Sequence, residues 1–121
     1  MTITLKTLAQ ATEQEIFDQV AAHLLTQRQK SQISSGDCAY LAPNGLKCAA
    51  GCLIGEEEYN PGFETWGWHS LVKKGLVPNE HKWFILDLQA LHDSCPVENW
   101  EVELAAFAKK RGLSFSLGET P

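Results

Sequence analysis

The stretch CAYLAPNGLKCAAGC, from Cys38 to Cys52, decides how the fold is interpreted, because it holds three of the four cysteines and the clearest turn in the chain. Proline presets φ for the first position of a turn and glycine accepts the left-handed conformation, so Pro43-Asn44-Gly45 predicts a tight turn. A three-residue loop with a bulge at Gly45 would pair the flanking residues as a β-hairpin. In that register one face is entirely apolar and comprises Cys38, Tyr40, Ala42, Leu46, Cys48 and Ala50, whereas Lys47 lies on the opposite face. The stretch therefore predicts one β-hairpin.

Helical patterns account for most of the remaining chain. Thr12 and Glu15 have the spacing of a capping box, and the apolar residues that follow recur at helical intervals. The predicted helices cover about 13–29, a short segment at 49–54, about 66–74 closed by Gly75, about 79–93 capped by Asn79, and about 97–111 ending at Gly112. Trp83 and Ile85 broaden the apolar stripe of the fourth helix, which predicts that it is packed on more than one side. We therefore expect an α+β fold: a mostly helical single domain of about four to five helices with one β-hairpin.

Length and composition limit the classes of function. A chain of 121 residues suits one domain over 1–121, with 113–121 expected as a mobile tail unless Phe115 and Leu117 hold it as an edge strand. The net charge of −5 argues against direct binding to nucleic acid, which requires a basic surface. Residues 1–11 lack the basic and then apolar pattern of an export signal, and no apolar run approaches the roughly 20 residues of a membrane span. We therefore expect a cytoplasmic location without membrane contact.

The four cysteines allow a metal site to be considered. Cys38, Cys48, Cys52 and Cys95 would supply the four sulfur ligands of a zinc ion. Structural zinc sites usually contain two close pairs of ligands, and here Cys48 and Cys52 form one. A histidine could replace Cys95, and His92 with Cys95 is a candidate second pair, although the helix end and Pro96 disfavour its geometry. The spacing therefore favours buried structural thiols, with no metal and no cofactor, and zinc remains the alternative.

Covalent chemistry at Cys48 is a second alternative. A thiol where a strand passes into the start of a helix has a lowered pKa, and a nucleophile also needs a base, for which His69, His81 and His92 are candidates. His92 and Asp93 are adjacent in sequence, so on a helix their side chains should diverge, which predicts no dyad. A regulated disulfide between Cys38 and Cys48 is a further alternative. No other catalytic motif is found.

Aromatic residues predict a binding surface. Trp66 and Trp68 are two residues apart and cannot share a helical face, so one of them should be exposed. Together with their neighbours they form the candidate binding set Tyr59, Phe63, Trp66, Trp68 and His69. An exposed tryptophan there would anchor a protein partner, or it would stack on a base or small ring of a ligand. Such a ligand could also be bound across the interface of an oligomer. Core packing is the competing interpretation.

The segment from Cys38 to Ile54, followed by Glu57-Glu58-Tyr59, resembles a signature of small proteins found in phages, prophages and bacterial genomes. Leu88 to Asp93 and Trp100 resemble the same group, in which a small residue can replace Cys52 and proline often stands at the position of Gly55. The resemblance implies the cytoplasm of an infected or lysogenic bacterium.

The leading hypothesis is a non-enzymatic interaction protein, a phage-related modulator or inhibitor of a host cytoplasmic protein. The alternatives are a cysteine-dependent enzyme with Cys48 as nucleophile and His69 or His92 as base, and a protein that sequesters a small ligand or nucleotide. A homo-oligomer is compatible with all three.

Overall fold

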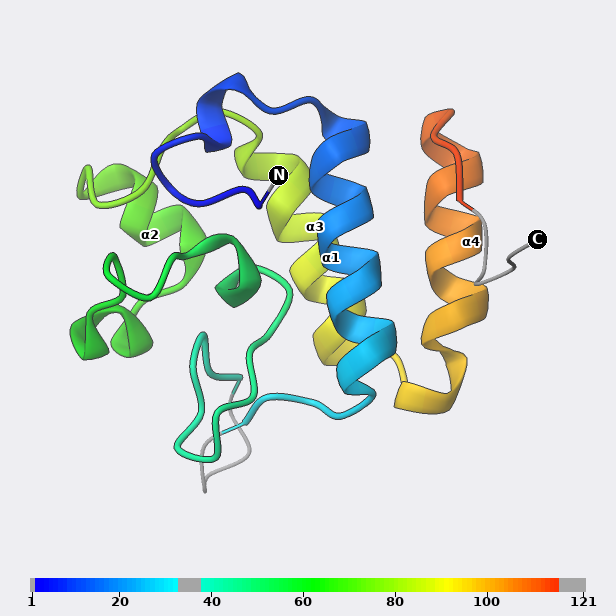
Figure 1. Cartoon of the computed structure of the whole chain (residues 1–121), viewed down its shortest axis with the longest axis horizontal. Helices are drawn as coiled ribbons and strands as arrows, with labels where there is room; N and C mark the ends of the chain where they lie inside the picture. The colour runs from blue at the N-terminus through cyan, green and yellow to red at the C-terminus, as the bar shows by residue number, and fades with distance from the viewer. Residues whose placement is uncertain (1, 33–37, 116–121) are drawn as a thin grey trace.

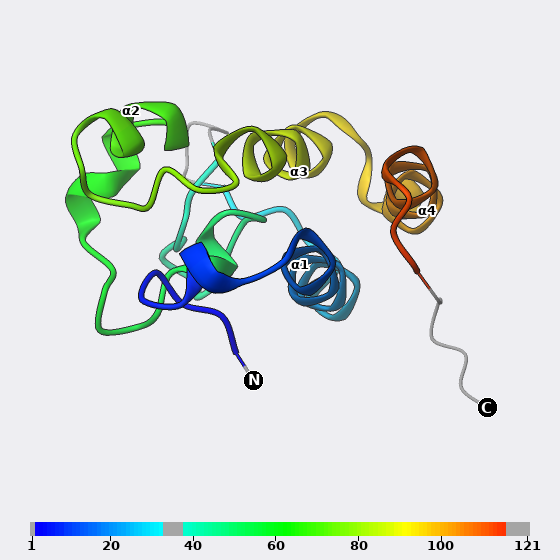
Figure 2. The same ribbon diagram turned by 90° about the horizontal axis from the view of Figure 1, so that it is seen from above.

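The computed structural model describes residues 2–32 and 38–115 of the chain. Its four α-helices are α1 (Glu13–Gln27), α2 (Trp68–Lys73), α3 (Lys82–Ser94) and α4 (Trp100–Arg111). Short 3₁₀ helices precede or join them at η1 (Leu8–Gln10), η2 (Gly51–Leu53), η3 (Pro61–Thr65) and η4 (Val97–Asn99). Helices α1 and α3 lie in the middle, and α2 and α4 lie at opposite ends of the molecule (Figure 1 and Figure 2).

The predicted β-hairpin and the α+β fold class are wrong. Among residues 2–32 and 38–115 there is no strand, and the single isolated bridge joins Gln32 and Cys38. The turn itself is confirmed, because Gly45 has a φ of +89° and its N–H donates to the carbonyl of Ala42 at 2.8 Å. The Ala42 N–H donates to the Leu46 carbonyl at 2.8 Å, but strand pairing does not continue beyond it. The described part of the chain is therefore all-α.

Side chains from other elements replace the missing ladder of backbone hydrogen bonds. The Ser31 hydroxyl donates to the Ala39 carbonyl at 2.7 Å, and the Glu64 carboxylate accepts the N–H groups of Tyr40 and Leu41 at 2.9 and 3.0 Å. On the other side of the turn, the Lys47 N–H donates to Gln27 at 3.0 Å. Since every buried backbone group needs a partner, these bonds let the segment cross the interior as coil.

The expected alternation of faces is also absent from this segment. Ala39, Ala49 and Ala50 are fully buried, although the hairpin register placed Ala39 and Ala49 on the face opposite to Ala50. Neighbouring elements enclose the segment from several sides, so small residues are buried irrespective of their order. The predicted short helix at 49–54 is reduced to the 3₁₀ turn η2.

The start of α1 agrees with its sequence pattern. The Glu15 N–H donates to the Thr12 hydroxyl at 3.1 Å, and the Thr12 N–H donates to the Glu15 carboxylate at 2.9 Å, which completes the capping box. Helix α4 ends at Gly112 as expected, because that glycine adopts a φ of +71°. Helix α3 begins later than expected, after His81 and not after Asn79.

The core forms where α1, α3 and α4 meet the coil segment. Its largest fully buried side chains include Phe17 of α1, Leu88 of α3 and Trp100 of α4. The Phe107 ring of α4 stacks on Phe17 with a centroid separation of 5.9 Å and meets Phe84 of α3 edge-on at 5.5 Å. These aromatic contacts join three helices into one core.

Part of the predicted tail is packed against α1. The Ser114 N–H donates to Gln14 at 2.9 Å, and the Phe115 ring meets Phe17 edge-on at 5.4 Å. Residues 116–121, including Leu117, lie outside the described residues. In the part of the chain that the structure describes, no helix combines the length and apolar character required to cross a bilayer.

Candidate functional site

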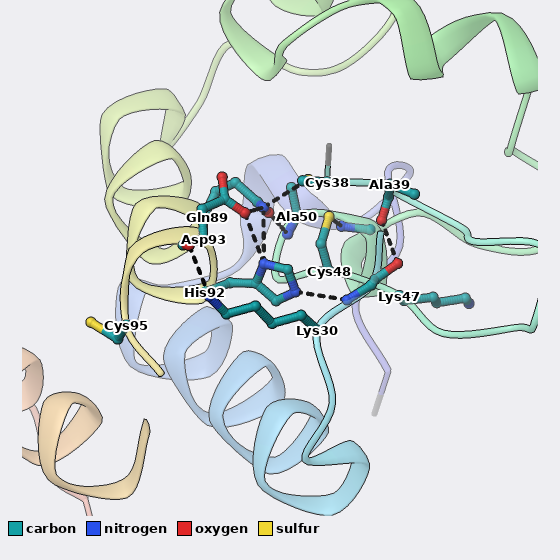
Figure 3. A network of polar contacts seen from close by, with 12 residues as sticks. Lys30, Cys38, Ala39, Lys47, Cys48, Ala50, Gln89, His92, Asp93 and Cys95 are labelled. Atoms are coloured by element: carbon teal, nitrogen blue, oxygen red, sulfur yellow. Dashed lines mark hydrogen bonds and ion pairs between the residues drawn. The ribbon is translucent and has the colours of Figure 1, made fainter. Parts of the chain in front are cut away.

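Figure 3 shows the polar network that surrounds His92, on the inner face of α3. The His92 ring is buried, and the backbone N–H of Ser31 donates to its Nε2 at 3.1 Å. Nε2 is therefore an acceptor, so Nδ1 carries the proton and donates to the Asp93 carboxylate at 2.8 Å. The expectation that the side chains of His92 and Asp93 diverge is wrong.

Gln89 connects this histidine network to the cysteine-rich segment. Its carbonyl accepts the N–H of Ala50 at 2.9 Å, and its amide donates to the Asp93 carboxylate at 2.8 Å and to the Cys38 sulfur at 3.0 Å. The Gly51 N–H donates to the Cys48 sulfur at 3.4 Å. Gln89 thus contacts Cys38 directly and the backbone two residues after Cys48.

Cys48 has the properties of a buried structural thiol. Its side chain is fully buried, and burial, followed by the neighbouring Cys38 side chain, raises the pKa of the thiol well above its usual value. His92 offers it no free lone pair, because the Ser31 N–H occupies Nε2. His69 packs on Trp83 with a ring separation of 6.0 Å, and the Nε2–H of His81 donates to the Ala11 carbonyl at 2.8 Å. The structure therefore gives Cys48 no activating base among these histidines.

The thiols of the other two cysteines have no contact with Gln89 among the hydrogen bonds of the described residues. The Cys52 thiol donates to the Ala49 carbonyl at 3.2 Å, and burial raises its pKa to about 12. Cys95 follows the end of α3, where its carbonyl accepts the indole N–H of Trp100 at 3.1 Å. Among the described residues no group of three or more histidine, cysteine or acidic side chains is arranged to hold a metal ion.

The predicted aromatic set is divided between core and surface. Phe63 and Trp68 are buried, and the Trp68 ring meets Tyr40 edge-on at 6.3 Å. Tyr59 is half-buried and its hydroxyl donates to Glu64. Trp66 and His69 are exposed, so these two are the members that a partner can reach. The prediction that one tryptophan of the Trp66–Trp68 pair is exposed is confirmed.

Sequence reasoning missed the largest exposed aromatic side chain. Trp83 is 66% exposed, although its spacing had been interpreted as part of a broad buried stripe, and that interpretation is wrong. Ile85, the other residue of that stripe, is buried as expected. The signal that identifies the exposed face is Asp87, one helical turn after Trp83 and itself exposed.

These residues form what we call the α2 surface: the exposed Trp66, His69, Lys73, Lys74, Leu76 and Trp83, and the partly exposed Lys82. The Lys74 ammonium lies 4.0 Å from the centre of the Trp66 ring, and that of Lys82 lies 4.4 Å from the centre of the Trp83 ring. Each tryptophan is therefore held against a cation, which orients the ring and keeps a positive charge beside it. Lys73 and Leu76 are exposed between the two tryptophans in sequence.

A groove of about 1130 Å³ lies elsewhere, along the outer side of α1 and the segment before it. None of the predicted site residues lines this groove. Two of the polar side chains that line it are engaged with backbone groups: Gln19 bonds Ile3 and Cys52, and the His23 Nε2–H donates to the Lys47 carbonyl at 2.8 Å. Burial lowers the pKa of His23, which favours the neutral ring.

Comparisons with known proteins add no relative. No family model matches the chain, and neither a curated protein nor a solved structure matches it.

Proposed function

We propose that this protein is a non-enzymatic interaction protein whose α2 surface binds an acidic segment of a partner protein. The observation that carries the proposal is the pair of exposed tryptophans, 44% exposed at Trp66 and 66% exposed at Trp83, each with a lysine ammonium over its ring. Tryptophans with accessible rings are the side chains that most often dominate binding energy at protein interfaces.

Helix α2 has one face that is directed away from the core, and the two exposed tryptophans lie at the margins of that face. Successive helical residues are rotated by about 100°, so His69, Ser70, Lys73 and Lys74 fall within an arc of roughly 140°. Trp83 packs on His69 at one margin of that arc, and Trp66 lies under Lys74 at the other. The opposite side of α2 carries Trp68 and Leu71, which are buried. The face between the two tryptophans is therefore directed away from the core.

Charge supports an acidic partner. From Trp66 to Trp83 the sequence holds three lysines and one glutamate, in a chain whose net charge is −5. A local cluster of cations on an acidic protein attracts carboxylates while the remainder of the surface repels them, which orients the partner during its approach. Leu76, 48% exposed, adds an apolar contact beside the cations.

The setting of this interaction comes from the sequence resemblance. The likeness of residues 38–54 to small phage and prophage proteins suggests a bacterial cytoplasm, and a modulator or inhibitor of a host protein there. The enzyme alternative lacks support because Cys48 is buried without a free base, and a ligand between Trp66, Trp68 and Tyr59 lacks support because Trp68 is buried against Tyr40.

The test starts by capturing partners from host lysate on the immobilised protein and purifying the retained protein. Its affinity is then measured for wild type, Trp66→Ala, Trp83→Ala and the control Val102→Ala. Val102 is 70% exposed but lies on α4, at the other end of the molecule (Figure 1). We expect each tryptophan variant to weaken binding by about tenfold or more and the control to bind as wild type.

Two results would contradict the proposal. If the double variant Trp66→Ala/Trp83→Ala binds the captured protein as tightly as wild type does, the α2 surface is not the binding site. If sedimentation shows a dimer of wild type that the same double variant abolishes, a second copy of this chain occupies the surface in place of an acidic partner. A parallel thermal-shift screen of nucleotides tests the small-ligand alternative, which predicts a raised unfolding temperature.

A further inference from the structure

The groove of about 1130 Å³ along α1, which we call the α1 groove, has two walls. One wall is the outer side of α1, and the other is the N-terminal segment, residues 2–11, which lies beside that helix (Figure 2). None of the residues of the α2 surface lines it. The function proposed for the α2 surface therefore does not use the α1 groove.

Hydrogen bonds hold the two walls together. The Gln19 side-chain carbonyl accepts the Ile3 N–H at 2.7 Å, and the Gln19 amide donates to the carbonyls of Ile3 and Cys52, both at 3.0 Å. Near the start of α1 the His81 Nε2–H donates to the Ala11 carbonyl at 2.8 Å. A groove whose walls are fixed before a ligand arrives loses little conformational entropy on binding.

The α1 groove carries negative charge. Glu15 and Asp18 both line it, and because they are three residues apart they are neighbours on the surface of α1. One oxygen of each carboxylate accepts a local hydrogen bond, from Thr12 and Gln14 respectively, and neither carboxylate forms an ion pair among the described residues. Within the described part of the chain no lysine or arginine lines the groove, and burial lowers the pKa of His23, which favours its neutral ring. The groove therefore attracts a cation.

The polar groups at the two ends of the α1 groove suit an extended peptide. Gln10 and Thr26 line it before the start and near the end of α1, and no hydrogen bond among the described residues engages either side chain. An extended peptide leaves its backbone N–H and carbonyl groups free to bond such side chains, whereas a helix pairs its own. From Glu15 to Gln27 the helix rises by about 18 Å, which is the length of roughly five or six extended residues.

Apolar surface lies between the charged and the polar groups of the α1 groove. Ala22 is one helical turn after Asp18, and Ala11 belongs to the opposite wall; both line the groove. Lysine and arginine lay their methylene stems against apolar surface of this kind while the charged head reaches a carboxylate or water. The lining therefore matches both parts of a long basic side chain.

We propose that the α1 groove binds an extended segment of a partner protein that carries lysine or arginine side chains. The cationic heads bind Glu15 and Asp18, and the backbone of the segment bonds Gln10 and Thr26. This recognition is independent of the α2 surface, which attracts the opposite charge. The protein would thus carry two separate docking sites, one for acidic and one for basic segments.

The test is an NMR titration of the ¹⁵N-labelled full-length protein with a synthetic peptide of alternating lysine and alanine, long enough to span the groove. In an extended chain every second side chain lies on the same side, so all lysines of this peptide can face α1. We expect shifts of the backbone amides of residues 10–27, and these shifts should weaken as salt is added. A peptide of alternating glutamate and alanine should cause no such shifts.

Matched charge reversals locate the binding site. Asp18 takes no part in the capping box of α1, and Asp18→Lys should weaken binding of the lysine peptide by about tenfold or more. Glu98→Lys changes the net charge by the same amount, but Glu98 is exposed in η4 and does not line the groove, so this variant should bind as wild type does. The double variant Trp66→Ala/Trp83→Ala should also bind the lysine peptide as wild type does, which separates this result from the test of the α2 surface.

Four results would overturn the proposal. The lysine peptide shifts no amide of residues 10–27, or the Asp18 and Glu98 reversals weaken its binding equally. Spermidine shifts these amides and the peptide does not, which would mean that the groove takes a small organic cation. The amides shift with protein concentration alone, which would mean that a second copy of this chain occupies the groove. The wild-type titration gives an answer even if a variant fails to fold.

Discussion

Gly51 occupies a position where no side chain fits, because the carbonyl group of Tyr40 lies where a Cβ atom would stand. A Cβ built on Gly51 would be 2.1 Å from the Tyr40 oxygen, and backbone cannot move aside as the end of a long side chain can. We expect Gly51→Ala to lower the free energy of unfolding by about 1–3 kcal/mol, the usual cost of overpacking. Urea unfolding followed by circular dichroism measures the change.

Gly67→Ala is the matched control for that substitution. A Cβ at Gly67 meets no atom within 4 Å, and the φ of −73° suits alanine. We expect its unfolding midpoint to lie close to that of wild type. Equal midpoints for the Gly51 and Gly67 variants would show that Tyr40 does not approach Gly51 so closely.

Single residues also show what could be predicted from the sequence and what could not. The Thr12 cap was predicted because its partner Glu15 is three residues away, and the left-handed Gly45 was predicted because proline and glycine act on their own backbone. The bonds from Ser31, Glu64 and Gln89 to residues 38–50 span up to 51 positions, and no local pattern encodes them. The hairpin prediction failed because it took the nearest backbone as the only available partner.

The N-terminal segment is fastened to the loop between η2 and η3 by one carboxylate. Glu58 accepts the N–H groups of Leu5 at 2.9 Å, Lys6 at 3.2 Å and Gly55 at 2.7 Å. Burial raises the pKa of Glu58, but these three hydrogen bonds outweigh burial, so the net pKa is lower than its usual 4.5. The carboxylate form is therefore the one that stabilises the folded state.

The sign of the pH dependence follows from that lowered pKa. The contribution of Glu58 is complete above the pKa of the unfolded chain and is lost as pH falls through the lower folded-state pKa. We expect wild type to lose more stability than Glu58→Gln between neutral pH and about pH 3, with the variant already less stable at neutral pH. Urea midpoints across this range test it, with the exposed neighbour variant Glu57→Gln as control. Parallel curves for wild type and Glu58→Gln would contradict the assignment.

Phe107 is one of the side chains that join helix α4 to the other helices. Its ring stacks on Phe17, meets Phe84 edge-on and lies 4.2 Å below the guanidinium of Arg111. Because Phe107 is only partly buried, we expect Phe107→Ala to cost about 2–3 kcal/mol, which is below the roughly 3–5 kcal/mol of a fully buried phenylalanine. Val102→Ala on the exposed side of the same helix should change the free energy of unfolding by less than about 0.5 kcal/mol. Chemical denaturation compares the two, and equal costs would place the docking contacts of α4 elsewhere.

The boundaries of α3 show the limit of helix prediction from pattern. Its apolar periodicity correctly predicted the helix and the burial of Ile85. The predicted N-cap was Asn79, whereas the observed N-cap is His81, which adopts a φ of +66°. The His81 imidazole donates to the Ala11 carbonyl, a contact 70 positions away that favours this later start. With the start at Lys82, Trp83 lies in the first turn on the side of Asp87 and is exposed.

Exposed lysines lie at both ends of the molecule, but their surroundings differ between the α2 end and the α4 end. Helices α2 and α4 lie at opposite ends (Figure 1 and Figure 2), and each end carries exposed lysines: Lys74 with its neighbours at α2, and Lys109 and Lys110 at α4. Among the described residues, the lysines that lie over exposed tryptophan rings are Lys74 and Lys82 of the α2 surface. If only the net charge of the protein governs association, loss of lysines at either end should slow association equally. If the partner binds the α2 surface, loss of the lysines at that end should slow association more.

Charge reversal at the two ends separates these cases. Lys74→Glu/Lys82→Glu and Lys109→Glu/Lys110→Glu shift the net charge by the same amount, starting from −5. We expect the α2 pair to reduce the association rate with the captured partner by about tenfold or more and to flatten its dependence on salt, because close charges steer encounter at low ionic strength. The α4 pair should retain the salt dependence of wild type. Stopped-flow association at several salt concentrations measures both, and equal slowing by the two pairs would mean that net charge, and not the α2 surface, governs the encounter.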